Sequence, residues 1–138
     1  MAGFFIENID NLLNFAEYFA FSLFSLFVFG YIYCKITPFD ELSLIKQGKV
    51  APAISFGGVL IGFILPVASA VSNSISFYDM VFWAIVSLTV QLIIFFILSR
   101  FILSNYVKDI ENDKISCALF YFFYSIGIGI LNAAAITY

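Results

Sequence analysis

Long apolar stretches alternate with short polar ones along this chain of 138 residues. Four runs contain no charged residue, at 18–34, 50–78, 80–99 and 115–138. Each run can supply the roughly 20 apolar residues that a helix needs to cross the hydrocarbon core of a bilayer. The pattern predicts an all-α membrane protein with four transmembrane helices, at about 15–34, 50–70, 78–99 and 115–137.

The composition leaves no room for a soluble domain beside these spans. Hydrophobic residues make up 63% of the chain and charged residues 11%, far from the averages of soluble proteins. We therefore expect a single four-span membrane domain over 1–138, with the lipid bilayer as its first partner.

Few residues suited to catalysis or to ligand binding are present. The chain has no His and two Cys, which disfavours a zinc cluster or a His-based triad. Six basic residues against nine acidic ones leave no basic footprint for nucleic acid. We expect no catalytic residues, no metal site, no cofactor and no nucleic-acid partner, and the sequence predicts that the protein is not an enzyme.

The basic residues indicate the orientation in the membrane. All six lie in or beside the connections after the first and third spans: Lys35, Lys46, Lys49, Arg100, Lys108 and Lys114. The positive-inside rule places these connections in the cytoplasm, and four spans then put both termini outside. Cys34 and Cys117 fall at cytoplasmic span ends, where we expect free thiols.

The two halves of the chain align when one is shifted by 65 residues. Lys49 then falls on Lys114 and Gly62 on Gly127, in repeats of about 12–72 and 77–138. Each repeat holds an even number of spans, so both enter the membrane in the same orientation. The alignment predicts two parallel-repeat helical hairpins, related by a pseudo-two-fold axis along the membrane normal.

The first cytoplasmic connection has the pattern of a short helix. Thr37 suits the N-cap, Pro38 the first helical position and Gly48 the residue beyond the end. Three apolar residues recur on one face of it: Phe39, Leu42 and Ile45. We interpret this segment as a short interfacial helix that orients the hairpin; a docking surface for a partner is the alternative.

Small residues mark helix contacts in the second and fourth spans. Gly58-x-x-x-Gly62 permits close helix approach in lipid, and we expect Gly127 and Gly129 to do the same on the fourth span. A pore wall is the alternative. Pro66 removes a backbone hydrogen bond and should kink or end the second span, leaving a carbonyl that needs a partner.

Five polar residues are candidates for a site within the membrane: Gln91, Ser25, Ser125, Asn132 and Glu17. Gln91 is the largest polar group near the middle of a span. We expect it to point into the bundle, either for interhelical hydrogen bonding or in a layer that contacts a solute. Glu17 lies near a span end, where it is either exposed at the interface or faces a cavity.

These residues together resemble a known pattern. Its parts are Ile36-Thr37-Pro38 with Glu41, the glycine-bearing second span up to Pro66, then Asp79, Trp83, Gln91 and the closing Gly129-Ile130-Leu131-Asn132-Ala133-Ala134. From Tyr33 to Tyr138 the chain is similar to bacterial inner-membrane proteins of the YjfL type, in the family called domain of unknown function 350. The resemblance implies a small multi-pass protein of the inner membrane and brings no activity. The sequence departs from it at Lys49-Val50-Ala51-Pro52, where the family more often has an Asn.

Three functions from different classes compete at this point. The first is a homo-oligomeric structural or accessory membrane protein, with other membrane or envelope proteins as candidate partners. The second is a homo-oligomeric channel or carrier for a small ion or solute. The third, an intramembrane enzyme, lacks a nucleophile with its base and lacks a set of metal ligands.

Overall fold

The computed structural model describes residues 1–102 and 104–136. Its long helices are α1 (Ala2–Ile36), α3 (Val50–Asn73), α4 (Phe77–Ile97) and α6 (Ile115–Ala135). Two short helices, α2 (Glu41–Lys46) and α5 (Tyr106–Glu111), lie between them, and a π-helical turn, η1 (Leu98–Ile102), extends α4. No strand occurs in these residues. The fold is all-helical, and four helices are long and apolar enough to cross a membrane.

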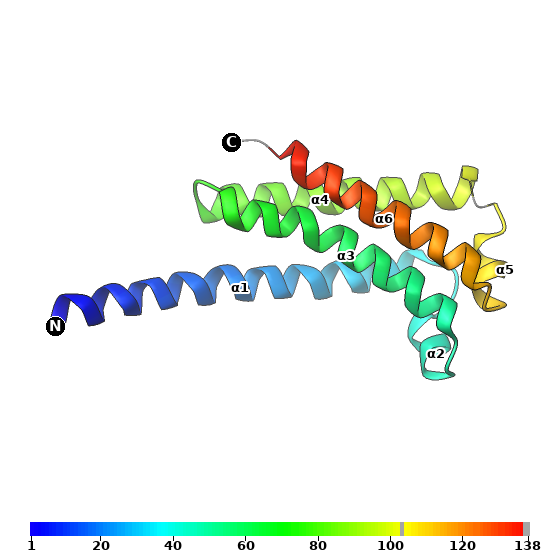
Figure 1. Ribbon diagram of the computed structural model, residues 1–138, viewed down its shortest axis with the longest axis horizontal. Coiled ribbons are helices and arrows are strands. Elements are labelled where there is room, and N and C mark those ends of the chain that lie inside the picture. Colours follow the sequence, from blue (N-terminus) through cyan, green and yellow to red (C-terminus); the bar gives the residue numbers. More distant parts are fainter. Residues whose placement is uncertain (103, 137–138) are drawn as a thin grey trace.

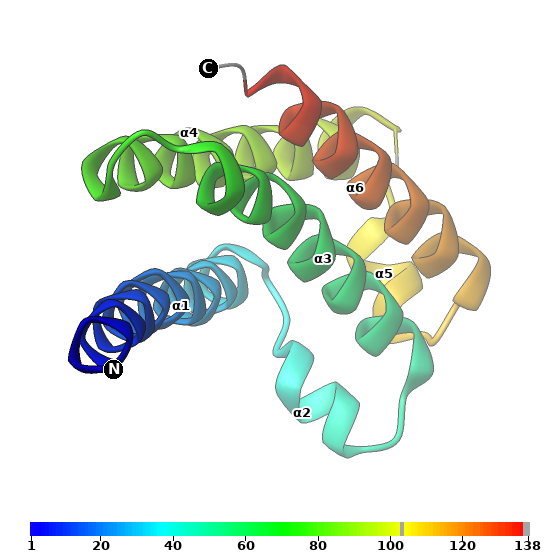
Figure 2. The ribbon, with the colours of Figure 1, turned by 60° about the vertical axis from the view of Figure 1, so that its left-hand side comes forward.

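The long helices lie side by side, with the short helices gathered at one end (Figure 1). We call this end the elbow end; the opposite one, where α3 turns into α4, is the turn end. α3 lies at the centre and packs against α6, α4 and α1, and α1 stands somewhat apart from the other long helices (Figure 2).

α1 is much longer than the sequence predicts. It begins at Ala2 instead of near residue 15, and its 35 residues span about 52 Å. The Tyr18 ring lies 6.0 Å from the ring of Phe77, the first residue of α4. The part of α1 before Tyr18 therefore extends past the α3–α4 turn (Figure 1). Glu7 and Asp10 interrupt the apolar run but not the helix, because neither residue breaks helical geometry.

Two further span ends differ from their predicted positions. α3 continues through Pro66 to Asn73, so the proline does not end the second span. The third span continues past Ser99, through η1 to Ile102. The predicted end of the fourth span, Thr137, and the last residue, Tyr138, lie outside the described residues.

The helix in the first connection begins later than the sequence predicts. Asp40 is its N-cap, and the Asp40 carboxylate accepts a hydrogen bond of 3.2 Å from the Ser43 backbone N–H. Thr37 instead ends α1, and its hydroxyl donates to the Tyr33 carbonyl at 3.2 Å. The cause is Pro38, which disfavours helical geometry in the residue before it. Gly48 ends the segment with a φ of +86°, in agreement with the prediction.

The elbow end shows a recurrence at the 65-residue spacing. α2 and α5 begin and end 65 residues apart, at Glu41–Lys46 and Tyr106–Glu111. Gly48 and Asp113, also 65 residues apart, both have positive φ, of 86° and 58°.

Candidate functional site

The crossing of α3 and α6 brings two backbones into direct contact. A Cβ on Gly129 would lie 2.7 Å from the Cα of Gly62 and closer still to the Gly62 carbonyl oxygen. A Cβ on Gly58 would lie 2.7 Å from the Cα of Phe122. These distances are far below van der Waals contact, so only glycine fits. The close approach also permits weak Cα–H···O contacts between the helices.

Gly127 does not share in this crossing, contrary to the sequence prediction. A Cβ there would meet nothing within 4 Å. The contact face of α6 instead runs through the buried residues Ser125 and Gly129. Gly127 lies two residues from each of them, which is about 200° around the helix, so it points away from α3.

Gln91 completes the backbone of α3 at the proline. Pro66 has no N–H, so the carbonyl of Gly62, four residues earlier, loses its helical partner. The Gln91 amide donates to this oxygen at 2.8 Å, and Gln91 is only 3% exposed. A side chain from α4 therefore supplies the missing hydrogen bond beside the α3–α6 crossing.

The other candidate polar residues do not converge on this point as a group. Ser125 is buried at the crossing, and its backbone carbonyl would lie 2.5 Å from a Cβ on Gly62. The Ser25 hydroxyl donates to the Ser22 carbonyl of its own helix. The Asn132 amide nitrogen is buried without a partner in the described part of the chain. Glu17 is exposed on α1.

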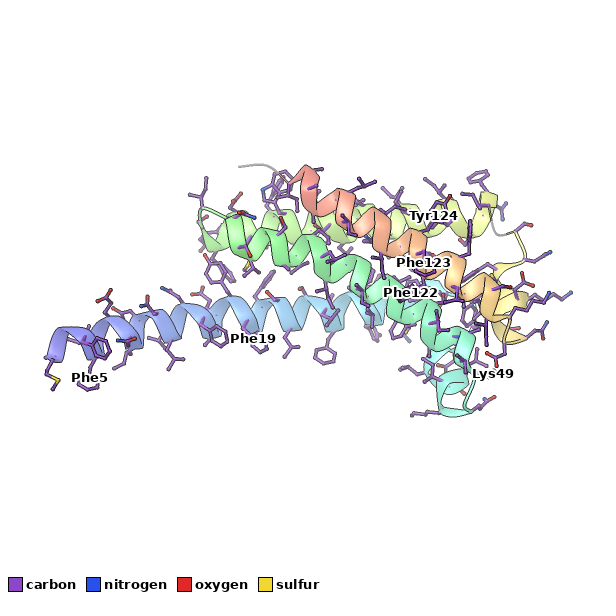
Figure 3. The ribbon with its side chains drawn as sticks, in the orientation of Figure 1. Phe5, Phe19, Lys49, Phe122, Phe123 and Tyr124 are labelled. Atoms are coloured by element: carbon purple, nitrogen blue, oxygen red, sulfur yellow. The ribbon has the colours of Figure 1, made fainter. Side chains whose placement is uncertain are left out.

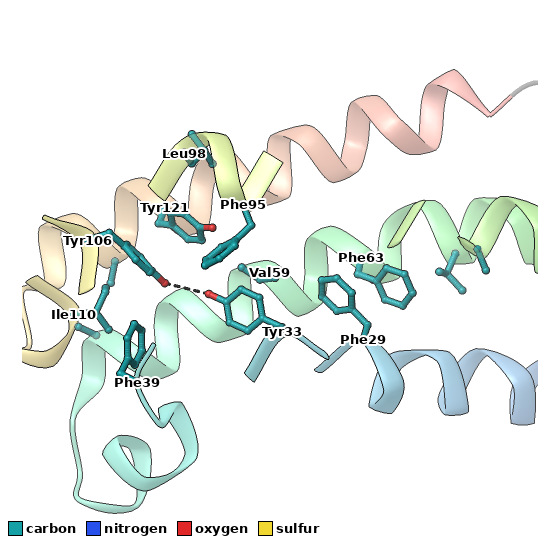
Figure 4. Packing of buried hydrophobic residues seen from close by; sticks show 14 residues of the cluster. Phe29, Tyr33, Phe39, Val59, Phe63, Phe95, Leu98, Tyr106, Ile110 and Tyr121 are labelled. Carbon is teal, nitrogen blue, oxygen red and sulfur yellow. Dashed lines mark hydrogen bonds between the residues drawn. The ribbon is translucent and has the colours of Figure 1, made fainter. Parts of the chain in front are cut away.

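A cluster of buried hydroxyl groups lies at the elbow end, and the sequence analysis missed it. We call Tyr33, Ser55, Tyr106 and Tyr121 the hydroxyl cluster. The Tyr106 hydroxyl lies 3.1 Å from that of Tyr33 and 2.5 Å from that of Ser55. The Tyr121 ring packs 4.7 Å from the Tyr106 ring (Figure 4), but its hydroxyl is buried without a hydrogen-bond partner among the described residues. The cluster joins α1, α3, α5 and α6.

Glu41 is buried beside this cluster. It is the first residue of α2 and is 1% exposed, and neither carboxylate oxygen has a hydrogen bond of good geometry within the described residues. Burial raises the pKa of Glu41, while the nearby Thr37 hydroxyl and Cys34 thiol act in the opposite direction. Burial also raises the pKa of Tyr106, to about 12, so this hydroxyl remains protonated at neutral pH.

No sequence signal links these groups. The three tyrosines lie in separate segments, and Glu41 resembles an ordinary acidic residue in the first turn of a helix. Within the part of the chain that the structure describes, no group of three or more His, Cys, Asp or Glu side chains could hold a metal ion. The polar contacts at both sites are hydrogen bonds between hydroxyl, amide and carbonyl groups.

At the elbow end, the two connections support each other directly. The Asp113 carboxylate accepts a hydrogen bond of 2.7 Å from the Ala51 N–H, in the first turn of α3. Lys49 donates through its Nζ to the Glu111 carbonyl at 2.6 Å. The loop after α5 therefore caps a helix that belongs to the other half of the chain. Cys34 and Cys117 are free.

Four apolar spans around a core of mainly aromatic and aliphatic side chains define a multi-pass membrane protein. Comparison with known proteins narrows the class. The chain belongs to the family described as Domain of Unknown Function (DUF350), which matches residues 7–136. This result agrees with the resemblance drawn from the sequence.

Two relatives show how much of the chain the similarity covers. The UPF0719 inner membrane protein YjfL of Escherichia coli (strain K12) is 33% identical over 130 residues, which are 94% of this chain and 98% of the relative. The UPF0719 transmembrane protein YshE of Bacillus subtilis (strain 168) is 27% identical over 129 residues, 92% of this chain and 96% of the relative. No solved structure matches the chain.

Proposed function

We propose that this protein is a structural or accessory component of the bacterial inner membrane that acts as a homo-oligomer. The observation that carries the proposal is the uncovered apolar surface on the first half of α1. Phe5 is 59% exposed and Phe19 is 55% exposed, and the Phe5 side chain stands free of the other helices (Figure 3).

The position of this surface favours a protein partner over lipid alone. The part of α1 before Tyr18 extends past the turn end, yet it carries exposed apolar side chains, among them Phe4, Phe5, Ile9, Leu12 and Leu13. A contiguous apolar patch outside the hydrocarbon core is typical of a contact with another protein. A second copy presents the same segment, so α1 can pair with α1 in a symmetric assembly.

The interior of one protomer supports the accessory function over transport. Gln91 donates to the Gly62 carbonyl, and α3 and α6 touch through their backbones at Gly62 and Gly129. The largest polar side chain near the middle of a span therefore serves the bundle itself.

Cysteine crosslinking tests the assembly. With Cys34 and Cys117 replaced by serine, Leu12→Cys should form disulfide-linked dimers in isolated membranes. Phe123→Cys is the control, since Phe123 is 65% exposed on α6, away from α1. A monomeric mass by native mass spectrometry together with no crosslink through Leu12→Cys would sink the oligomer. Flux of ions or small polar solutes into proteoliposomes would move the function to a channel or carrier.

The orientation and the repeat belong to the same proposal. We place the elbow end, with Lys46 and Lys108, in the cytoplasm and both termini in the periplasm, with α2 at the interface. The equal spacing of α2 and α5 supports two hairpins as parallel repeats. In a background without native cysteines, an impermeant thiol reagent should label Asn73→Cys in intact cells and leave Asn112→Cys unlabelled; the opposite result reverses the orientation.

A further inference from the structure

A groove of about 710 Å³ separates the middle of α1 from the second half of α3. Its walls are apolar and come from Phe19, Leu23 and Leu26 on α1 and from Phe63, Ile64 and Val67 on α3. Asn11, Asn14 and Ser72 line the same groove toward the turn end. The groove thus runs from an uncharged polar mouth to an apolar interior.

The depth of the mouth corresponds to the headgroup layer of a bilayer. Tyr18 packs against Phe77 at the level where α4 begins. Asn14 lies four residues before Tyr18, which is about 6 Å along α1. The polar layer on each side of the hydrocarbon core is about 5–7 Å thick. The mouth therefore lies in this layer while the walls lie in the hydrocarbon.

The size of the groove favours an acyl chain over a helix as its occupant. A helix with side chains is about 10–12 Å wide and rises 1.5 Å per residue, so ten residues fill roughly 1,200 Å³ or more. A volume of about 710 Å³ would hold only part of such a helix, whereas an extended acyl chain is slender enough to lie within it.

The charges around the mouth select among headgroups. Glu7, Asp10, Glu17 and Asp79 are the charged side chains at the turn end. Every Lys and Arg of the described residues lies in or beside the two connections at the elbow end. These carboxylates would repel an anionic headgroup, whereas an ammonium group would be attracted and could donate to the Asn side-chain oxygens.

We propose that this groove binds one phospholipid with a zwitterionic headgroup that carries a primary amine, as in phosphatidylethanolamine. An acyl chain lies between α1 and α3, and the ammonium group lies at Asn11 and Asn14. This inference does not depend on the oligomer, since it concerns a groove within one protomer.

Native mass spectrometry of protein equilibrated with defined lipids tests the proposal. We expect one phosphatidylethanolamine retained per protomer, with at least tenfold weaker retention of phosphatidylglycerol. Ala68→Trp fills the groove and should lower retention of phosphatidylethanolamine at least tenfold. Ala134→Trp is the control, because Ala134 is exposed on α6, outside the groove, and it should change retention less than twofold.

A positive charge introduced at the mouth tests the headgroup separately from the fold. Asn14 is exposed, so Asn14→Lys should leave the bundle intact and shift the preference toward phosphatidylglycerol at least fivefold. Equal retention of both lipids by the wild type, or an unchanged preference in Asn14→Lys, would refute the selection by charge. Wild-type retention in Ala68→Trp would show that the lipid binds elsewhere and would overturn the site.

Discussion

At the elbow end, aromatic side chains from several helices are buried against one another, whereas at the turn end aromatic side chains stand exposed along α1. Phe29 and Phe63 stack at 4.4 Å and lead into the hydroxyl cluster, while Phe15 and Phe19 stack on each other within α1. The two regions thus share residue types and differ in packing.

The difference lies in the polar groups. In a bilayer, an apolar side chain gains little free energy when it moves from lipid into a helix contact. Close packing and hydrogen bonds therefore decide where helices meet. The elbow end has hydroxyl groups that need partners and two short helices that close it. The facing part of α1 at the turn end offers mainly intrahelical bonds, such as Ser22 to the Tyr18 carbonyl. Aromatic content alone therefore does not predict burial in this protein.

Breaking the α3–α6 crossing should have the largest effect on both ends. Gly62→Leu places side-chain atoms where the Ser125 carbonyl already lies 2.5 Å from a Cβ, so we expect a loss of about 3 kcal/mol in the free energy of unfolding. Gly127→Leu is the matched control, 65 residues along and open on all sides, and it should change stability little. Unfolding in mixed micelles by dodecyl sulfate measures both. Equal losses in the two variants would contradict the assigned crossing.

The hydroxyl cluster offers a second contrast, between two stacked tyrosines. Tyr106→Phe removes the hydroxyl shared by Tyr33 and Ser55 and should destabilise the protein by about 1–2 kcal/mol. Tyr121→Phe removes a buried hydroxyl with no partner among the described residues and should be neutral or stabilising. The same unfolding assay decides, and a larger loss for Tyr121→Phe would mean that its hydroxyl has a partner in the membrane.

A double-mutant cycle sharpens the assignment of Gln91. Gln91→Leu leaves the Gly62 carbonyl unpaired and should cost about 0.6–1.7 kcal/mol. Pro66→Ala supplies the missing helical N–H, so the same Gln91→Leu change should cost little in that background. Additive losses would show that Gln91 acts independently of the proline.

The smallest expected effect is the response of α2 to pH. Since burial raises the pKa of Glu41, the folded protein favours the protonated acid. Glu41 therefore contributes its full stabilisation at a pH below the pKa that it has in the unfolded chain. This stabilisation is lost as the pH rises through the higher pKa of the folded protein. Asp40, Cys34, Tyr33 and Tyr106 are the titratable groups near it.

Melting temperatures across pH test this prediction with two variants. Glu41→Gln should remove the loss of stability on going from acid to neutral pH, whereas Glu111→Gln, at an exposed position on α5, should retain it. A wild type whose melting temperature rises over this range would give the opposite sign and refute the assignment.

Spans and small-residue contacts could be predicted from sequence because they depend on local composition. Residue type alone predicts the four helices and the importance of Gly58 and Gly62. It also predicts that Pro66 leaves one backbone carbonyl without its helical hydrogen bond. The partner of that carbonyl could not be predicted, since Gln91 reaches it from α4 and its rotation toward α3 is set by packing. Gly127 shows the same limit of sequence-based prediction. The 65-residue alignment pairs Gly127 with Gly62, but it does not tell which face of α6 contacts α3.

The hydroxyl cluster and the length of α1 were missed for different reasons. Tyr33, Tyr106 and Tyr121 meet only after three separate segments have packed, and tyrosines are common at membrane interfaces. Charged residues near the N-terminus led to a short first span, because hydropathy measures insertion into lipid and not helical geometry. Pro38 likewise moved the start of α2 by restricting Thr37.

The cap that Asp113 provides for α3 has a consequence for biosynthesis. The Ala51 N–H obtains its side-chain partner only after the ribosome has added more than sixty further residues. Until then, the N-terminus of α3 lacks this side-chain cap. The residue 65 positions before Asp113 is Gly48. Because glycine has no side chain, it cannot provide a matching cap for the N-terminus of α6. The cap therefore acts in one direction only, from the second half of the chain to the first.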